Sequence, residues 1–386
     1  MPIRPFRQDD IAGVNALHTD IRWSSRSTDQ WQWLMDNPAR QASLSPVGWV
    51  LENEGRIDGF IGNFHLHYFR GTVRYTGATA YSVIVSPRAK GSIRALAAPF
   101  LQQEDVFAVS ILNANHLGAP VYLRLGLTPF PEKTHALKLT WIISPIQTFI
   151  SHFLRDLNDS LPRLARALGE RFTPTRSIFF DARQVSWPSS VHVLEDLSDH
   201  SAYARFWDEL KAQPGLTVDR SPEIMRWRMA QPGLAIAPIL IGYYEADSLV
   251  AYALAQLSKT GPLDVSALEI IDLVTLDRAS TDAAPQLVHA LKKAARRMGA
   301  AKVRLPLLSE GLKSRLAPVR LTARREGGWG HAFVHFHAAP SDFADWHPTG
   351  FDGSYSFSLR QPVLRARSKR LLASSKTEKL SPASAG

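Results

Sequence analysis

Residues 83–98, VIVSPRAKGSIRALAA, combine residue types and spacing that suit the binding of a charged ligand. The β-branched residues predict a strand, and Ser-Pro followed by Gly91 predicts a sharp turn into a helix. The start of a helix directs backbone N–H groups and positive partial charge at one point, beside which Arg88 and Lys90 add two cations. The turn therefore suits a pyrophosphate, although a surface turn with solvated charges explains the same residues. Its glycine spacing is neither that of a P-loop nor that of a GxGxxG loop.

A second candidate element follows the next predicted strand, in residues 113–130 (NANHLGAPVYLRLGLTPF). Asn115 comes after the end of that strand, and a short helix behind it carries Tyr122. The helix stops at Gly126, because glycine readily adopts the left-handed conformation that ends helices. A final strand then follows.

The two segments resemble the motifs of the GNAT superfamily of acyl-CoA N-acyltransferases. The family's loop Q/R-x-x-G-x-G/A, which wraps the pyrophosphate of coenzyme A, matches Arg88 and Gly91 and departs at Ile93. The family's second signature, Asn-x-x-Ala-x-x-Leu-Tyr-x-x-Leu-Gly-Phe, matches at Asn115, Tyr122, Leu125 and Gly126. With the opening IRPFRQDDIAGVNALH, which is similar to the family's first strand and helix, the resemblance covers about residues 1–135.

The resemblance implies roles for individual residues. The residues expected to bind acetyl-CoA or another acyl-CoA are Val83, Val85, Arg88, Lys90, Gly91, Ser92 and Asn115. A backbone N–H of the strand near Val83 to Val85 would hold the thioester carbonyl, which amine acylation must polarise. Tyr122 would protonate the leaving thiolate, although a packed aromatic residue of a helix is an equally good reading.

The general base is less clearly marked. His65 and His67 alternate with apolar residues in GNFHLHYF, so they share one face of a strand and are candidate catalytic residues. The same spacing also fits a metal ion or a solvated strand face. Residues 331–339 (HAFVHFHAA) repeat the alternating His pattern, and because no third ligand type is defined there, they are interpreted as a strand and no metal site is predicted. Glu269 and Asp272, on the matching strand further along the chain, are further acidic groups that could reach a shared cleft.

The chain contains an internal repeat. Residues 27–38 (STDQWQWLMDNP) and 221–232 (SPEIMRWRMAQP) align without gaps, and both predict a short helix with Ser as its N-cap and Pro after its end. The identical positions are Ser27/Ser221, Trp33/Trp227, Met35/Met229 and Pro38/Pro232. The flanking predicted elements follow the same order in both copies. The alternative is two unrelated domains that share one local match.

The predicted fold class is α/β (α+β), with two tandem GNAT-like mixed-sheet domains flanked by helices. Residues 1–135 form the acyl-CoA-binding domain, 136–185 a helical connector, 186–360 a second, degenerate GNAT-like domain and 361–386 a basic disordered tail. The second copy has no Arg-x-x-Gly turn after its matching strand, LEIIDLVTL, so we expect it to shape the acceptor pocket or a dimer surface. The aromatic segment 351–362 is expected to pack as an edge segment.

Composition excludes several classes of protein. The chain of 386 residues has no Cys, so disulfides, thiolate metal sites and a Cys nucleophile are excluded. No apolar run is long enough for a membrane span, and the charged N-terminus does not resemble a signal peptide, so a cytoplasmic location is expected. Half of the net charge of +10 lies in the tail, which argues against specific nucleic-acid binding while leaving contact of the tail with RNA or anionic lipid open.

The sequence thus predicts an N-acyltransferase that moves an acyl group, most simply acetyl, from acyl-CoA to an amine. The acceptor would be a small-molecule or sugar amine, and homodimer formation is left open. Two alternatives stay open beside it: a two-lobed ligase that uses aminoacyl-tRNA, and a non-catalytic tandem GNAT scaffold. The ligase would show steeply salt-dependent tRNA binding, whereas the scaffold would show no thioester turnover.

Overall fold

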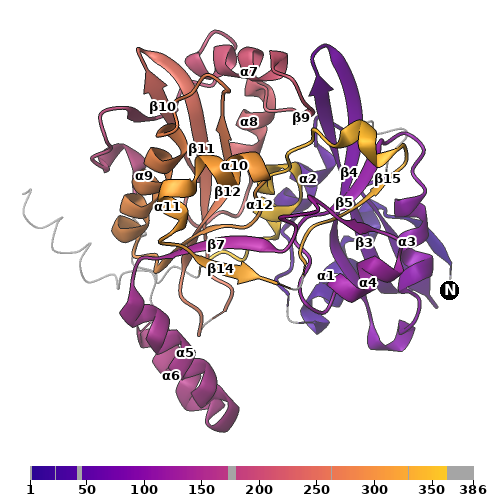
Figure 1. The fold of residues 1–386 in the computed structure, drawn as a ribbon. Coiled ribbons are helices and arrows are strands. Elements are labelled where there is room, and N and C mark those ends of the chain that lie inside the picture. Colours follow the sequence, from indigo (N-terminus) through magenta and orange to yellow (C-terminus); the bar gives the residue numbers. More distant parts are fainter. Residues whose placement is uncertain are drawn as a thin grey trace, which may run out of the picture.

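The computed structural model describes residues 2–21, 23–40, 46–172, 180–261, 263–328 and 330–362. Residues 363–386 of the predicted basic tail lie outside this description. Two lobes stand side by side, each built on one mixed β-sheet with helices on its faces (Figure 1). Both the mixed α/β class and the two tandem sheets predicted from the sequence are confirmed.

The first lobe holds most of the N-terminal elements. In chain order these are β1 (Ile3–Pro5), α1 (Ile11–Asp20), α2 (Thr28–Met35), β2 (Gly48–Asn53), β3 (Arg56–Arg70), β4 (Val73–Val85), α3 (Ile93–Leu101), β5 (Ala108–Ile111), α4 (Ala119–Arg124) and β6 (Thr128–Pro129). Its sheet has the strand order β1-β2-β3-β4-β5-β15-β6, with β9 added against β3.

The second lobe repeats this order. Its elements are β7 (Leu137–Ile142), β8 (Val191–Val193), α7 (Ala202–Ala212), β9 (Thr217–Val218), α8 (Pro222–Met229), β10 (Ile239–Glu245), β11 (Ser248–Ser258), β12 (Ala267–Thr275), α9 (Ala283–Met298), β13 (Lys302–Leu305), α10 (Glu310–Arg315), α11 (Ala317–Arg320), β14 (Arg324–Gly327), β15 (Phe333–Phe336) and α12 (Tyr355–Ser358). The sheet order is β14-β7-β13-β12-β11-β10-β8. Short 3₁₀ helices span Gln8–Asp10, Pro87–Ala89, Ala182–Gln184, Pro340–Phe343 and Gly350–Asp352.

The lobes exchange strands, and β9 of the second lobe also pairs with β3 of the first. β7 leaves the first lobe and pairs with β13 and β14 in the second sheet, whereas β15 returns from the second lobe and pairs with β5 and β6 in the first sheet. The connector predicted as helical over residues 136–185 therefore begins with a strand of the second sheet. The predicted second domain, residues 186–360, likewise gives two strands, β9 and β15, to the first sheet.

The repeated helices meet at the centre of the molecule. Ser27 and Ser221 cap α2 and α8, because each hydroxyl accepts a hydrogen bond from the backbone N–H three residues later. The rings of Trp33 and Trp227, which occupy equivalent positions in the repeat, stack with their centroids 4.2 Å apart and an interplanar angle of 4°. The repeat read from the sequence thus forms a direct contact between the lobes.

Three apolar cores hold the fold together. One lies between the lobes and combines residues of both, among them Phe64 and Tyr252. A second surrounds α9 in the second lobe, and a third lies between α3 and the outer face of the first sheet. Because the central core is shared, the two lobes pack as one body.

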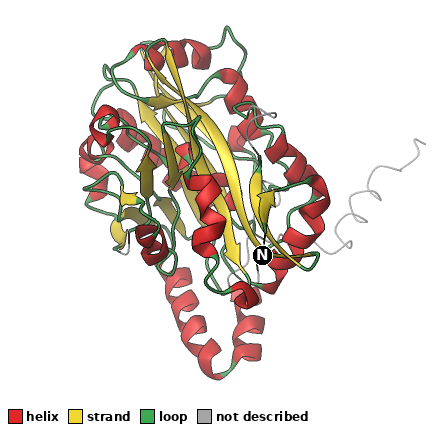
Figure 2. Ribbon diagram, turned by 90° about the vertical axis from the view of Figure 1, so that its right-hand side faces the viewer, coloured by secondary structure: helices red, strands yellow, loops and turns green. Residues whose placement is uncertain are grey.

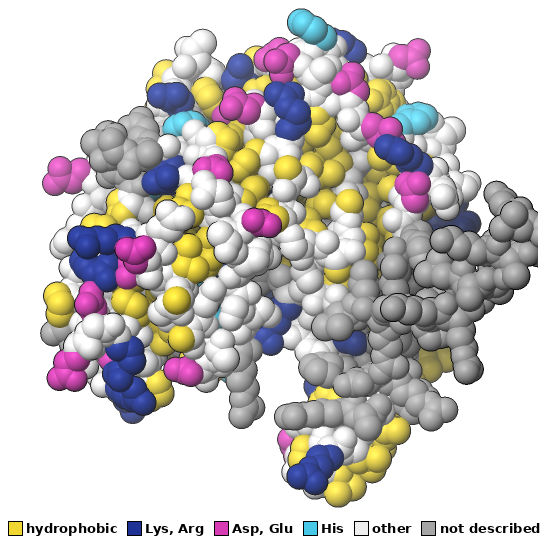
Figure 3. All heavy atoms as spheres, turned by 180° about the vertical axis from the view of Figure 1, so that it is seen from behind, with side chains coloured by type: hydrophobic (Ala, Val, Ile, Leu, Met, Phe, Trp, Pro, Cys, Tyr) yellow, Lys and Arg dark blue, Asp and Glu magenta, His cyan; other side chains and the backbone are white. Residues whose placement is uncertain are grey.

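The remaining helices, α5 (Pro145–Ser160) and α6 (Pro162–Phe172), form a hairpin that projects away from both lobes in two perpendicular views (Figures 1 and 2). Apolar side chains are exposed along it (Figure 3), and its large exposed apolar residues are Ile146, Phe149, Phe153, Leu161 and Leu164. Neither these helices nor any other in the described part of the chain has the length and apolar character that crossing a bilayer requires.

Candidate functional site

The turn after β4 has the geometry expected from its sequence. The chain leaves β4 through the 3₁₀ helix Pro87–Ala89, and Gly91 then takes a φ of +99°, which disfavours other residues. A Cβ atom at Gly91 would meet nothing within 4 Å, so the glycine is needed for its conformation and leaves open space beside the backbone. The turn leads directly into α3, whose first N–H groups lack intrahelical partners, as at every helix start.

Positive charge surrounds this turn. Arg88 and Lys90 are exposed, and neither forms an ion pair with the residues that the structure describes. Arg94, in the first turn of α3, is a third exposed cation that the sequence reading did not single out. Ser86 anchors the start of the turn, because its hydroxyl donates to Asp58 Oδ1 at 3.0 Å and its N–H donates to the Asp58 carbonyl at 2.7 Å.

β4 separates from β5 before it reaches this turn. The two parallel strands pair only at Ala78 with Val109 and at Thr79 with Ser110, whereas β4 continues to Val85 against β3. Within the described residues, the stretch 80–85 of β4, here called the open stretch, therefore has no strand partner on its β5 side. Val83 and Val85, near which the thioester carbonyl is predicted to bind, lie in the open stretch.

A β-bulge distorts the open stretch. The β3–β4 register shifts where Phe60 faces Ile84 and Gly62 faces Tyr81, so β4 has one extra residue there. Ser82, in this bulge, has a φ of +50°, which is unusual for a residue with a side chain. Bulges turn backbone groups out of the regular ladder, and here the bulge lies beside the missing strand partner.

Asn115 and Tyr122 lie after β5 in the predicted order. The Asn115 Oδ1 accepts hydrogen bonds from the N–H groups of Leu117 and Gly118, at 3.0 and 2.8 Å, and so fixes the loop before α4. Burial raises the pKa of Tyr122 to about 12, so its hydroxyl keeps its proton at neutral pH. A Cβ at Gly118 would lie 3.0 Å from the Tyr122 ring, which explains why glycine replaces the alanine of the GNAT signature.

His65 and His67 lie outside the open stretch. In the β3–β4 ladder they pair with Ala78 and Thr76, at and beyond the point where β5 joins the sheet. His65 is buried, and desolvation lowers its pKa to about 4. The structure thus does not bring these histidines together with the turn and Tyr122, and the prediction of a base at either position receives no support.

The aromatic C-terminal segment, residues 349–358, runs between the lobes and reaches the open stretch. The Ser354 hydroxyl donates to the Ala80 carbonyl at 3.1 Å, and the Phe357 ring packs against Tyr81 with centroids 5.5 Å apart. A Cβ at Gly353 would lie 3.2 Å from Leu112, just after β5. The prediction of an edge segment at 351–362 is therefore wrong, because these side chains are central.

The acidic residues of the second lobe are already engaged. Glu269 accepts hydrogen bonds from Ser258, Arg304 and Tyr355, and both its oxygens are used. Asp272 binds Arg220 and other polar groups in a fully buried network. The expectation that these two carboxylates reach a shared cleft is wrong, because both are fully buried and hydrogen-bonded to other side chains of the protein.

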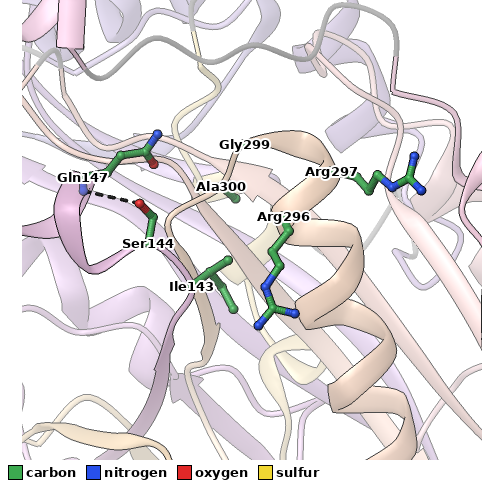
Figure 4. A pocket seen from close by; sticks show the side chains of 7 residues that line it. All are labelled: Ile143, Ser144, Gln147, Arg296, Arg297, Gly299 and Ala300. Carbon is green, nitrogen blue, oxygen red and sulfur yellow. Dashed lines mark hydrogen bonds between the residues drawn. The ribbon is translucent and has the colours of Figure 1, made fainter.

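A pocket of about 380 Å³ lies elsewhere, between the start of α5 and the end of α9 (Figure 4). Its lining residues are Ile143, Ser144, Gln147, Arg296, Arg297, Gly299 and Ala300. It belongs to the second lobe and contains none of the residues predicted to bind or react. Among the described residues, no group of three or more His, Asp or Glu side chains is arranged to hold a metal ion.

No family model matches the sequence, and no curated protein matches it significantly. Several solved structures match this structure. A GCN5-related N-acetyltransferase from Anabaena variabilis is 15% identical with a TM-score of 0.49, over 87% of this chain and 72% of that one. A GCN5-related N-acetyltransferase from Kribbella flavida is 13% identical with a TM-score of 0.47, over 89% and 73% of the respective chains.

N-myristoyltransferase from Saccharomyces cerevisiae, solved with bound myristoyl-CoA, aligns over 95% of this chain and 85% of its own. The TM-score is 0.51 at 8% identity, so the likeness concerns the fold. Because it covers 95% of this chain, the likeness extends over both lobes. The chain therefore has the fold of the GNAT superfamily of acyl-CoA N-acyltransferases, built as two tandem lobes.

Proposed function

We propose that the first lobe binds an acyl-CoA and transfers its acyl group to an amine. The observation that carries this proposal is the open stretch of β4, which leads from a gap in strand pairing to the cationic glycine turn at Gly91. The pantetheine arm would replace the missing strand beside residues 80–85. The pyrophosphate would then meet the start of α3, with Arg88 and Lys90 beside it.

The chemistry follows from this placement. The amine nitrogen attacks the thioester carbonyl carbon, the C–N bond forms and the C–S bond breaks, while the nitrogen releases a proton to solvent. Backbone N–H groups near Val83 and Val85 stabilise the oxyanion, and the protonated Tyr122 supplies the proton that the leaving thiolate takes up.

The C-terminal segment supports a short acyl group, most simply acetyl. The backbone at Gly353 lies close to Leu112, and the Ser354 hydroxyl donates to the Ala80 carbonyl, so residues 353–354 already occupy the end of the open stretch nearest β5. A long acyl chain would have to displace them, whereas an acetyl group would not.

Thiol release from a series of acyl-CoA esters, with a panel of amines, tests the proposal. Acetyl-CoA is expected to react faster than octanoyl- or myristoyl-CoA. Tyr122→Phe is expected to lower the rate by about 10²-fold while leaving acyl-CoA affinity unchanged, because general acid catalysis contributes about that much. If Tyr122→Phe reacts as fast as the wild type, Tyr122 is not the general acid. The absence of thiol release with every donor and amine would contradict acyl transfer itself.

A further inference from the structure

The two lobes place equivalent arginines beside equivalent strands. Arg26 directly precedes Ser27, the N-cap of α2, and Arg220 directly precedes Ser221, the N-cap of α8. The guanidinium of Arg26 reaches Ser82 on β4, and that of Arg220 reaches Asp272 on β12. Because of the repeat, the contacts of Arg26 can be compared with those of Arg220 at the equivalent position.

Ser82 and Asp272 occupy the same position in their sheets. Ser82 comes four residues after Ala78, which pairs with the parallel strand β5. Asp272 comes four residues after Leu268, which pairs with the parallel strand β13. Both strands also shift register against their antiparallel neighbour at this point.

In the second lobe the arginine has its anions within the chain. Arg220 Nε donates to Asp272 Oδ2 at 2.8 Å, and Nη2 donates to Asp272 Oδ1 at 3.2 Å. This two-point contact uses the Nε–Nη2 edge of the guanidinium, which matches a carboxylate in shape. Asp352 adds a second carboxylate at 3.4 Å.

In the first lobe the same edge lacks a carboxylate. Arg26 Nη2 donates to the Ser82 hydroxyl at 3.2 Å and Nη1 to the Phe357 carbonyl at 3.3 Å. Its Nε is buried without a hydrogen-bond partner, and no described acidic side chain forms an ion pair with it. Aromatic rings surround the guanidinium, with the centroid of Tyr81 5.4 Å from Cζ.

A second basic side chain near Arg26 is also unpartnered. His18 is buried, and neither of its ring nitrogens has a hydrogen-bond partner among the described residues. Burial, with a smaller contribution from the positive charge of Arg26, lowers the pKa of His18 to about 4. Burying a positive charge without a nearby negative charge costs free energy. This region therefore favours the binding of a negatively charged group.

We propose that Arg26 binds a carboxylate of one of the substrates, through the Nε–Nη2 edge that holds Asp272 in the second lobe. The inference rests on the proposed function, because Ser82 lies in the open stretch where the acyl group would react. The carboxylate can belong to the amine acceptor, as in an amino acid, or to the acyl group of the donor, as in succinyl-CoA.

Two assays separate these sources. Calorimetry compares succinyl-CoA with butyryl-CoA, and thiol release from acetyl-CoA compares amino acids with their amides. We expect one assay to prefer the carboxylate by about ten- to hundredfold, the range of a charge-assisted hydrogen bond. Arg26→Gln should abolish that preference, whereas Arg324→Gln, which removes an exposed charge from the second lobe, should retain it.

Ser82→Asp supplies the internal carboxylate that the second lobe has. It should raise the Tm, because Arg26 gains an ion pair, and it should abolish the carboxylate preference by competition. The reverse change in the other lobe, Asp272→Ser, should lower the Tm. An unchanged or lower Tm for Ser82→Asp would show that the aromatic rings already satisfy Arg26, and would overturn the proposal.

The outcomes for the two proposals differ. Normal acetyl-CoA binding with no carboxylate preference in either assay, or a preference that survives Arg26→Gln, contradicts the role of Arg26 and leaves acyl transfer standing. A protein that binds no acyl-CoA contradicts acyl transfer. In that case the Tm of Ser82→Asp still decides whether Arg26 lacks an anion.

Discussion

At the scale of single residues, the two lobes differ in the partners of their equivalent buried arginines. The second lobe pairs its buried Arg220 with Asp272, whereas Arg26 in the first lobe keeps an unpaired Nε. Two histidines of the first lobe, His18 and His65, are almost inaccessible, and their pKa values are lowered to about 4, chiefly by desolvation.

These histidines predict how stability depends on pH. Each ring is neutral in the folded protein and takes up a proton on unfolding below its ordinary pKa of 6.5. The free energy of unfolding should therefore be highest above pH 6.5 and fall as the pH is lowered toward 4. Urea denaturation of the wild type and of His65→Gln at pH 7.5 and 5.0 measures the effect of one ring.

The loss of stability between these pH values should be about 2 kcal/mol smaller in His65→Gln, because one proton contributes about 1.4 kcal/mol per pH unit below 6.5. His152→Gln is the control, since that side chain is exposed on α5. The same acid sensitivity in the wild type and His65→Gln would contradict the assigned burial.

At the scale of elements, the exchange of β7 and β15 determines which parts can fold separately. β15 lies between β5 and β6, so the first sheet is incomplete without a strand from the end of the second lobe. The C-terminal segment 349–358 adds contacts to both lobes, including Ser354 with Ala80 and Thr349 with Asp272.

Truncation should show this dependence. A chain that ends after residue 330 loses β15 and segment 349–358, and we expect it to lose cooperative unfolding and its near-ultraviolet circular dichroism. A chain that ends after Pro362 loses no contact described here and should keep the wild-type Tm. Native-like melting of the shorter chain would contradict the exchange of strands.

The sequence allowed some of these elements to be predicted and not others. The α2 and α8 helices were predictable because capping serines and terminal prolines are local signals, and the turn at Gly91 carries a local signal too. The exchange of strands between the lobes was not predictable, because β7 and β15 are short apolar strands that could pair in either sheet. Arg26 was missed as a single residue, although its alignment with Arg220 in the repeat was a usable signal.

At the scale of the whole molecule, the lobes are joined by a shared core rather than by a linker. Trp33 and Trp227 stack at its centre, and Trp33 Nε1 also donates to the Trp227 carbonyl at 3.0 Å. Because residues of both sheets belong to this core, the protein should unfold in one transition.

Replacing Trp33 by Ala tests this coupling. The change should lower the free energy of unfolding by about 3 kcal/mol, the lower end of the range for truncating a buried large aromatic side chain to Ala. The two lobes should then unfold in two separate transitions. Leu321→Ala is the control, because Leu321 is 85% exposed, and it should stay within about 0.5 kcal/mol of the wild type. Calorimetric melting measures both effects, and a single unchanged transition in Trp33→Ala would contradict the shared core.

Calorimetric titration of acetyl-CoA into the wild type and two glycine variants measures whether acyl-CoA binds at the end of β4. Gly91 and Gly71 both have positive φ and open space for a Cβ, but Gly71 lies in the β3–β4 turn at the far end of β4. We expect one acetyl-CoA site per chain, which Gly91→Asp abolishes and Gly71→Asp keeps. Absent binding in the wild type at about millimolar ligand, or equal binding by both variants, would contradict it.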